Sequence, residues 1–373
     1  MVWQHKKIDD LGCSVEKQGS LIAWKEKTGW RRYMKKKSRI TVAFGMGIIL
    51  VGVMGGCTTK QNVSELDEVK VILRYGEVNP EGHIITNTAH YFADRVKELS
   101  QGHIEVEVYP SGQLGEETQY YQALKMGALD LYRGNIASIS ETGDFEISAL
   151  ALPYIFRNRD HFWAVCNSEL GNRLLDKVQK AGSQMVGLCY LDEGPRNFFV
   201  TEKPIKNLAD IKDLRIRVMP SEMLEDTVRA LGAIPVPTAY AELYTSLESD
   251  SVNGGENPII SYYSNQFYKV APYYVKDGHT YAPSIILISE ITWKRFSEEE
   301  KEIICEAAKL TEEFNKSEIE KADKEAYKKL EDAGVTITEL EDPEDWSRAV
   351  ETVYQKYGAK YMDVIQDVRN IEY

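Results

Sequence analysis

The sequence predicts an α/β protein with two domains, on three observations. At 373 residues, the chain exceeds what one hydrophobic core usually supports. Strand-like runs rich in β-branched residues alternate with amphipathic helical runs, and this pattern occurs once in each half of the chain. Such alternation is typical of a parallel sheet covered by helices. Finally, residues 297–334 form a long helical stretch.

The first half begins with a predicted strand at residues 69–75, followed by a turn at residues 79–82. A helix follows, because apolar residues between Ala89 and Leu99 recur at spacings of three and four before a stop at Gln101-Gly102. Residues 104–109 alternate as a second strand. The next predicted helix consists of residues 116–126, which Gly127 closes.

The second half repeats this pattern. Predicted strands lie at residues 185–190, 198–201 and 214–218. Residues 221–231 form a helix, with Ser221 as its N-cap and Gly232 as its stop. Two α/β units of this kind, with polar groups at the strand ends between them, are typical of a binding protein with a central crevice.

Two helical segments end the chain. Residues 297–334 begin with a serine and three glutamates, which cap the first turn and suit the helix dipole. The stripe expected to be buried is too sparse in its second half for a coiled coil. A final helix is predicted at residues 345–368. The predicted buried positions are Ile303, Ala307, Leu310 and Phe314 in the long helix, and Trp346, Val350, Val353, Tyr354 and Tyr357 in the final one.

Charge and cysteine content exclude several classes of protein. Residues 1–60 hold 12 lysines and arginines against 4 acidic residues, which leaves 33 basic and 54 acidic residues for the rest. A body that acidic repels nucleic acid. The five cysteines show no CxxC pair and no metal-ligand spacing, and an odd, scattered set is not a disulfide framework. P-loop, nucleophile-elbow and HExxH motifs are also missing from the sequence.

The N-terminal region indicates export. A basic stretch at residues 34–39 precedes an apolar run at residues 40–54, which together are typical of a signal peptide. The run ends at Gly55-Gly56-Cys57, which resembles a bacterial lipobox, so we expect a signal at residues 34–57 with Cys57 lipidated. An uncleaved anchor is the alternative, although the run is short for a span of about twenty residues. Residues 1–33 are interpreted as an upstream extension before a start at Met34, and residues 58–68 as a flexible tether.

Two arginines and an asparagine lie in distinctive local contexts. Arg196 lies in Gly-Pro-Arg-Asn-Phe-Phe, Arg217 in Leu-Arg-Ile-Arg-Val-Met-Pro-Ser, and Asn257 in Gly-Gly-Glu-Asn-Pro. A guanidinium presents parallel N–H donors that match the two oxygens of a carboxylate, so an arginine at a strand end can bind an organic acid bidentately.

These segments resemble the DctP family of solute-binding proteins from tripartite ATP-independent periplasmic (TRAP) transporters. The resemblance extends from about residue 69 to the C-terminus and implies a periplasmic-binding-protein-like fold with a hinged central cleft and a long C-terminal helix that crosses both domains. It implies one domain at residues 69–193 plus about 283–320, and another at 194–282 plus about 321–373. The segments that carry it, in the family's order, are residues 108–115, 123–130, 149–154, 194–199, 214–221 and 254–258.

The resemblance also implies roles for individual residues. Arg217 is the expected carboxylate-pairing residue, with Arg196, Asn257 and Asn79 as further cleft residues; Tyr240 is the tyrosine that we assign to the cleft. Simpler readings exist for each. Arg217 fits a solvated strand face, Arg196 a loop charge and Asn257 a turn that follows two glycines, while most of the tyrosines between residues 240 and 281 fit core or hinge packing.

We therefore expect an extracytoplasmic, lipid-anchored, monomeric receptor that uses no cofactor and catalyses no reaction. It would bind an organic acid, either a C4-dicarboxylate or a sugar acid such as a uronate, and deliver it to the small and large TRAP membrane subunits. One alternative is a receptor of the same fold that feeds a signalling partner. Another is an enzyme that uses Glu242 or His279 as a base, and a third is the binding protein of an ATP-driven transporter, against which the order of the segments argues.

Overall fold

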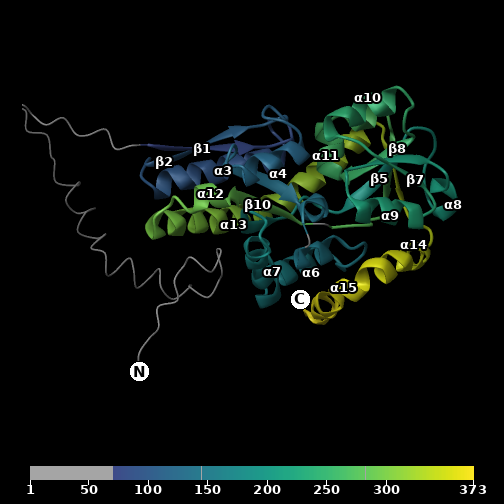
Figure 1. Ribbon diagram of the computed structural model, residues 1–373. Helices are drawn as coiled ribbons and strands as arrows, with labels where there is room; N and C mark the ends of the chain where they lie inside the picture. The colour runs from purple at the N-terminus through teal and green to yellow at the C-terminus, as the bar shows by residue number, and fades with distance from the viewer. Residues whose placement is uncertain (1–69, 144, 282) are drawn as a thin grey trace, which may run out of the picture. The chain divides into compact units, whose positions relative to one another are not determined.

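The computed structural model describes residues 70–143, 145–281 and 283–373. The predictions for residues 1–33, the signal at 34–57 with Cys57, and the tether at 58–68 lie outside these residues. Two sheets with their helices form the described part of the chain, one on the left of Figure 1 and one on the right. Among the described residues, no helix is long and apolar enough to cross a membrane.

The first sheet has five strands in the order β2-β1-β3-β10-β4. β1 is parallel to β2 and β3, whereas β10 is antiparallel to both of its neighbours. The expectation of a purely parallel sheet is therefore wrong, because β10 comes from a distant part of the chain and enters between β3 and β4. The strands are β1 (Val71–Gly76), β2 (Ile104–Tyr109), β3 (Leu131–Asn135), β4 (Met185–Leu191) and β10 (Ser284–Ser289).

The second sheet has six strands in the order β11-β9-β5-β8-β6-β7. It is also mixed, since β5 is antiparallel to β8 and β9 while the other pairs are parallel. The two sheets share no strand, and the domain boundaries themselves stay a prediction. The strands are β5 (Arg196–Val200), β6 (Arg215–Val218), β7 (Ile234–Pro237), β8 (Gly254–Pro258), β9 (Tyr273–Lys276) and β11 (Thr336–Glu339).

Helices surround both sheets and begin at residues that favour helix starts. Ser221 caps α9 through its side chain, as predicted, and Ser297 forms a reciprocal capping box with Glu300 at the start of α13. The α-helices are α3 (Ile84–Leu99), α4 (Glu117–Lys125), α5 (Ile136–Ile139), α6 (Arg159–Cys166), α7 (Glu169–Lys180), α8 (Leu208–Ile211), α9 (Glu222–Ala230), α10 (Leu243–Glu248), α11 (Ile259–Ser264), α12 (Glu290–Trp293), α13 (Glu298–Asp332), α14 (Pro343–Ala349) and α15 (Glu351–Asn370). The 3-10 helices are η3 (Ser140–Thr142), η4 (Glu146–Ala151), η5 (Tyr240–Glu242) and η6 (Phe267–Lys269).

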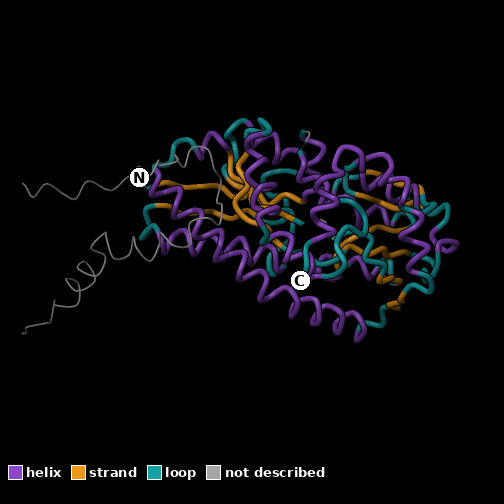
Figure 2. The backbone as a smooth tube through the Cα atoms, turned by 90° about the horizontal axis from the view of Figure 1, so that it is seen from below, coloured by secondary structure: helices purple, strands orange, loops and turns teal. Residues whose placement is uncertain are grey.

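Helix α13 runs past both sheets (Figure 2). Its first half packs into the core of the first sheet through Ile304 and Ala308, and its second half into the core beside the second sheet through Ile319 and Leu330. The predicted stripe was displaced by one residue over much of the helix. Several buried positions are polar, so an apolar pattern could not reveal them. The buried residues are Lys301, Ile304, Ala307, Ala308, Thr311, Asn315, Ile319, Asp323, Ala326 and Leu330.

Polar side chains of α13 fix the segment where the chain passes from the first sheet to the second. Asn315 binds the backbone of Asp192 on both sides, because its Oδ1 accepts from the Asp192 N–H at 2.8 Å and its Nδ2 donates to the Asp192 carbonyl at 3.1 Å. Arg159 of α6 donates to the carboxylates of Asp192 and Asp323. These contacts hold residues 192–195 in place, and β5 starts directly after them.

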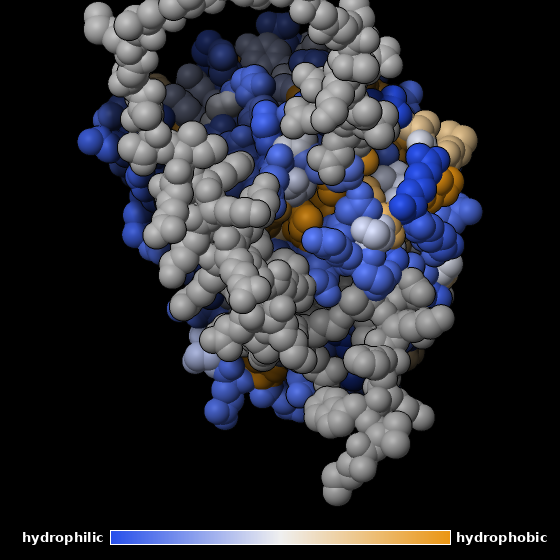
Figure 3. Space-filling view, turned by 90° about the vertical axis from the view of Figure 1, so that its left-hand side faces the viewer, coloured by the Kyte–Doolittle hydropathy of each residue, from blue (hydrophilic) through white to orange (hydrophobic). Residues whose placement is uncertain are grey.

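The C-terminal segment differs from the single helix predicted at residues 345–368. It forms α14 and α15, which are separated at Val350, and α15 has a kink at Tyr361. The predicted apolar face is correct: Trp346, Val350 and Val353 are buried in the main core cluster, against which Tyr354 and Tyr357 pack. Where it is not covered by grey atoms, the surface at the end of the molecule that carries β1 and β2 is mainly hydrophilic, with some apolar side chains (Figure 3).

Candidate functional site

Strand ends of the first sheet bring a buried charge cluster together. Arg133 of β3 donates to both carboxylate oxygens of Glu77, which follows β1, at 2.6 and 3.2 Å. Its third nitrogen donates to Glu193, beyond β4, at 2.8 Å. Ser284 at the start of β10 also donates to Glu193. Burial lowers the pKa of Arg133, but Glu193 and Glu77 outweigh this and raise it well above the ordinary value. Arg133 is therefore a cation held between two carboxylates.

Sequence reasoning missed Arg133 and assigned no role to Glu77 or Glu193. The available signal was a charged residue in a short segment whose apolar members are Leu131, Tyr132 and Ile136. Arg133 is only 3% exposed, and a charge in such a segment is buried only when it is paired. The partners lie 56 and 60 residues away, so the sequence alone could not indicate the pairing.

On the second sheet, Arg196 at the start of β5 pairs with Glu256 of β8. Its Nε and Nη2 atoms donate to the two carboxylate oxygens, and Nη2 also donates to the Glu256 carbonyl at 3.0 Å and to Oδ1 of Asn257 at 3.3 Å. Burial would raise the pKa of Glu256, but Arg196 and His279 lower it to about 2. Arg196 is thus buried and mainly engaged within the protein, although its Nη1 has no hydrogen-bond partner among the described residues.

Arg217 of β6 differs from the other two buried arginines. Its Nε and Nη2 both donate to the carbonyl of Thr238, at 2.9 and 2.6 Å, and its Nη1 is buried without a partner. Within the described residues, Arg217 forms no ion pair, although it is only 1% exposed. Burial lowers the pKa of Arg217, and Glu256 offsets only part of that effect. The solvated strand face considered from the sequence is therefore wrong for Arg217, although Arg215, two residues earlier in β6, is exposed.

Asn257 lies in β8 and not in a turn, which corrects the expectation for Gly254-Gly255. A Cβ on Gly254 would lie 2.4 Å from the carbonyl oxygen of Phe199, and one on Gly255 would lie 2.9 Å from the Phe199 ring. The two glycines therefore allow β5 and β8 to approach closely. Asn257 Oδ1 accepts from Arg196, which leaves its Nδ2 buried without a partner. In register, Asn257 shares the face of the sheet that carries Arg217.

Of the other two predicted residues, Tyr240 lines a cavity, whereas Asn79 does not, although its neighbours Val78 and Pro80 do. Asn79 is buried, and its side-chain Nδ2 donates to Glu77 at 2.9 Å, so its amide supports the Glu77 carboxylate. Tyr240 lies beside Arg217, whose Cζ is 5.7 Å from the ring centroid, and its hydroxyl accepts from Asn265 at 2.8 Å. The cavity has a volume of about 270 Å³ and is lined by Val78, Pro80, Ser111, Gly112, Glu116, Tyr240, Ala241, Tyr244, Asn265 and Phe267.

His279 forms the far end of the Arg196–Glu256 pair. Its Nδ1 lies 2.6 Å from Asp277 Oδ2, its Nε2 lies 3.6 Å from Glu256 Oε2, and its ring stacks on Phe198 with centroids 4.2 Å apart. Burial lowers its pKa, but Asp277 and Glu256 outweigh this and raise it to about 9. At neutral pH His279 is therefore a cation and no base. Glu242, the other base considered, is exposed on η5.

His83 links the first-sheet side to α11. Its Nδ1 accepts from the backbone N–H of Ile85 at the start of α3, so the ring proton is on Nε2, which lies 3.1 Å from the Ser261 hydroxyl. Burial lowers the pKa of His83 to about 3, and the ring is neutral at physiological pH. His83 therefore has a structural role at the start of α3.

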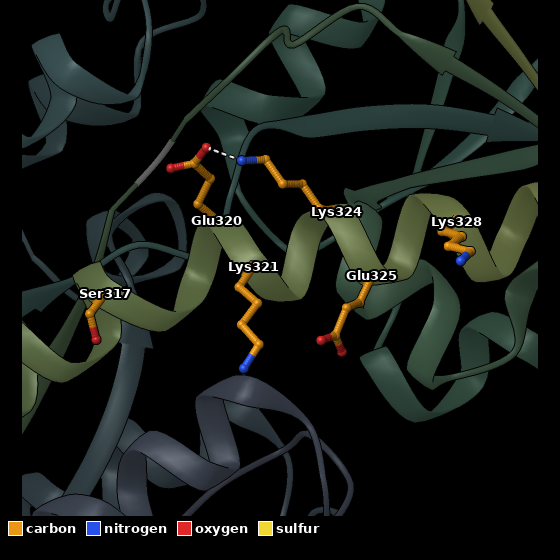
Figure 4. A pocket seen from close by; sticks show the side chains of 6 residues that line it. All are labelled: Ser317, Glu320, Lys321, Lys324, Glu325 and Lys328. Carbon is orange, nitrogen blue, oxygen red and sulfur yellow. Dashed lines mark hydrogen bonds and ion pairs between the residues drawn. The ribbon is translucent and has the colours of Figure 1, made fainter.

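A second hollow, of about 490 Å³, lies along α13 and does not resemble a binding site. All of its lining residues come from one helix, and apart from Glu320 and Lys324 their side chains point in different directions (Figure 4). Lys324 pairs with Glu320 at 2.6 Å as an exposed i,i+4 ion pair, which is ordinary helix-surface chemistry. Among the described residues, no group of three or more His, Cys, Asp or Glu side chains could hold a metal ion.

Comparison with known proteins gives the same fold and a consistent family. Residues 75–360 match the family described as bacterial extracellular solute-binding protein, family 7. The chain is 30% identical over 291 residues to the C4-dicarboxylate-binding protein DctB of Bacillus subtilis, which covers 77% of this chain and 82% of that protein.

Two solved structures illustrate the similarity. A TRAP periplasmic solute-binding protein from a Bradyrhizobium species, in complex with galacturonate, superposes with a TM-score of 0.77 at 29% identity and covers 80% of this chain and 99% of its own. The sugar-acid-binding protein DctPAm of Advenella mimigardefordensis, in complex with galactonate, gives a TM-score of 0.77 at 28% identity and covers 80% and 97%. The fold predicted from the sequence is thereby confirmed.

Proposed function

The chain belongs to family 7 of the bacterial extracellular solute-binding proteins, and we propose that Arg217, Arg196 and Asn257 are the residues with which it binds the carboxylate of an organic acid. The protein is the solute-binding receptor of a TRAP transporter. Its ligand is a carboxylate-containing acid, either a C4-dicarboxylate or a sugar acid. It delivers this acid to the small and large membrane subunits.

One observation carries the assignment of the site: Arg217 is a buried guanidinium without an anionic partner. Of the three buried arginines in the described part of the chain, Arg133 pairs with Glu77 and Glu193, and Arg196 pairs with Glu256. A buried charge that lacks a counter-ion is costly. The protein tolerates this cost at Arg217 because a ligand carboxylate supplies the missing charge.

Neighbouring donors complete a site for two oxygens. Nη1 of Arg217 and Nδ2 of Asn257 are buried donors without partners, and they come from adjacent strands on one face of the sheet. Nη1 of Arg196 is a third free donor, on the residue that fixes the Asn257 amide. Charge-assisted hydrogen bonds from such donors are about twice as strong as neutral ones. The arrangement suits a carboxylate, whose two oxygens can accept from these donors.

The receptor acts by binding, and no reaction step is required. Groups from both sheets surround the ligand, so the bound state favours the arrangement in which the two sheets approach each other, through differential affinity for the two states. Neither base considered from the sequence supports the enzyme alternative, since Glu242 is exposed and His279 is protonated. We further propose that Cys57 carries a lipid that keeps the receptor at the outer face of the membrane.

Thermal unfolding of the purified protein with and without candidate acids tests the proposal. A ligand that binds only the folded state at 100 times its Kd adds about 2.7 kcal/mol to the free energy of unfolding. We expect D-glucuronate, D-galacturonate, D-galactonate or succinate to raise Tm, and D-glucose, which matches glucuronate without its carboxylate, to leave Tm unchanged. If no acid raises Tm in protein freed of copurified ligand, or if glucose acts as well as glucuronate, the carboxylate site is wrong.

A further inference from the structure

The first-sheet side of the site carries an excess of negative charge. Glu77 and Glu193 share the single cation of Arg133. Glu77 is saturated: its Oε1 accepts from the backbone and side chain of Asn79 as well as from Arg133, and its Oε2 accepts from Arg133. Glu77 therefore contributes a fixed charge, and it has little capacity for a further hydrogen bond.

Glu117 of α4 adds a second uncompensated carboxylate. Its Oε1 accepts from the hydroxyls of Ser138 at 2.7 Å, Tyr132 at 3.1 Å and Tyr121 at 3.4 Å. All three donors are neutral, and no ion pair of Glu117 is found among the described residues. Its Oε2 has no hydrogen-bond partner among them either. Three hydroxyls thus orient the carboxylate and leave one oxygen free.

Glu193 also has one free oxygen. Its Oε1 accepts from Arg133 and Ser284, and its Oε2 has no hydrogen-bond partner in the described part of the chain. Glu193 is 8% exposed, so little of its side chain is open to solvent. Burial raises the pKa of Glu193, against which Arg133 and Arg196 act, and Glu117 is among the groups that affect the pKa of Arg217. The cavity described above is lined by Glu116, which precedes Glu117, and by Tyr240, which lies beside Arg217, so the Glu117 side and the Arg217 side both border it.

The free groups on the two sides are complementary in kind. The second sheet offers buried donors without partners, Arg217 Nη1 and Asn257 Nδ2. The first-sheet side offers acceptors, Glu117 Oε2 and Glu193 Oε2. A ligand that satisfies both sides carries an acceptor group with a negative charge at one end and hydrogen-bond donors at the other.

We propose, on the basis of the proposed function, that the site selects a sugar acid with one carboxylate and several hydroxyl groups. Glu117 and Glu193 reject acids that carry a second carboxylate. Hydroxyl groups of the ligand donate to these two carboxylates. A second ligand carboxylate has no proton to donate at neutral pH, and it would be placed against two like charges in a water-poor site, where repulsion is strong. C4-dicarboxylates are excluded for the same reason.

Two matched pairs of open-chain acids test the selectivity by isothermal titration calorimetry. Galactarate is galactonate with the terminal CH₂OH oxidised to a second carboxylate, and D-glucarate is related to D-gluconate in the same way. With the protein as purified, we expect the monocarboxylate of at least one pair to bind at least about 10-fold more tightly than its dicarboxylate, a difference of about 1.4 kcal/mol. Succinate should bind as weakly as the dicarboxylates.

Neutral variants identify the groups responsible. Glu117→Gln and Glu193→Gln should each weaken monocarboxylate binding and narrow the preference over the dicarboxylate by about 10-fold, because each removes an acceptor and a like charge. The matched control is Glu339→Gln. It removes an exposed carboxylate of the edge strand β11 that pairs with Lys276, and it should change neither monocarboxylate affinity nor the preference over the dicarboxylate. Glu117 is only half-buried, so its variant reports on the site even if Glu193→Gln does not fold.

The outcomes separate the two proposals. If succinate, galactarate or D-glucarate binds as tightly as the monocarboxylates, the selectivity is wrong while the carboxylate site stands. A preference that persists unchanged in Glu117→Gln and in folded Glu193→Gln also overturns it. If none of these acids binds, and neither do the uronates, the proposed function fails and this inference fails with it.

Discussion

Replacing Arg217 by lysine tests the carboxylate site most directly, because lysine keeps the charge and removes the fork. In the wild type, Nε and Nη2 of Arg217 both donate to the carbonyl of Thr238, so that Nη1 is the nitrogen left for a ligand. A lysine has one nitrogen at the end of a flexible chain, and it cannot hold the Thr238 carbonyl and present a second fixed donor in the same direction.

The expected loss follows from the bonds that change. The variant loses one charge-assisted hydrogen bond to the ligand, and net values for such bonds are about 1.5–3 kcal/mol. The formal charge remains, so the penalty of an unpaired ligand carboxylate in a buried site is avoided. We therefore expect Arg217→Lys to raise the Kd of the best acid by about 10- to 150-fold.

The control variant comes from the same strand. Arg215 lies two residues earlier in β6, is exposed and binds the side chain of Asn253 and the carbonyl of Asp250. Arg215→Lys should leave the Kd within twofold of the wild type. Calorimetric titration of both variants, with circular dichroism to confirm folding, gives the comparison. An unchanged Kd in folded Arg217→Lys, or an equal loss in both variants, would refute the assignment of Arg217.

Three further predictions concern stability. In urea unfolding of the ligand-free protein, Arg196→Met should cost about 3–5 kcal/mol because it leaves a buried carboxylate without its partner, whereas Arg217→Met should cost less than about 1 kcal/mol; equal losses would contradict this distinction. The pKa of His279 is about 9, against an ordinary value of 6.5, so its bound proton stabilises the folded state fully below pH 6.5. The free energy of unfolding of the wild type should therefore fall by up to about 3 kcal/mol as pH rises from 6.5 through 9. A His279→Gln variant whose stability depends on pH as strongly as that of the wild type would contradict this prediction. Gly254→Ala should lower the free energy of unfolding by about 1–3 kcal/mol, because the new Cβ would conflict with the neighbouring strand. Gly358→Ala, within α15 and with room for a Cβ, is the control and should be neutral or stabilising. Similar effects of the two substitutions would contradict the close packing of β5 and β8.

Local sequence signals predicted the elements whose chemistry is local. The bounds of β2 coincide with those predicted at residues 104–109, and α9 and α13 begin at the predicted serine caps. Each of these relies on alternation or on a capping side chain within a few residues. The strand β8 was missed because glycines at its start usually indicate a turn, and only the close approach of β5, more than fifty residues earlier, explains them.

The sequence indicated only those candidate site residues whose signal is local. Arg196, Arg217 and Asn257 were identified from their local contexts, and the structure brings them to one end of the second sheet; their role in binding stays a prediction. The sequence could not distinguish Arg196, which is paired, from Arg217, which is not, because the partner of Arg196 is 60 residues away. Nor could it show that the first-sheet side is acidic, since that depends on Glu193 and Glu117 being placed together by β4 and α4.

The buried arginines differ in whether they have a carboxylate partner within the protein, and this difference distinguishes arginines that hold the structure from the one that we propose binds the ligand. Arg133 and Arg196 each have a carboxylate in the protein, so each is stable without a ligand and holds other groups in position. Arg217 has only a carbonyl, and its unpaired nitrogen makes the ligand-free state less stable than a fully paired site would be. A ligand carboxylate therefore gains the attraction of a charge that is already desolvated and fixed, which lowers the cost of binding. Adding an internal partner on the neighbouring strand, as in Val236→Glu, whose position pairs with Arg217 in register, should abolish binding of the acid while leaving Arg217 in place, because the new carboxylate would compete for the same guanidinium.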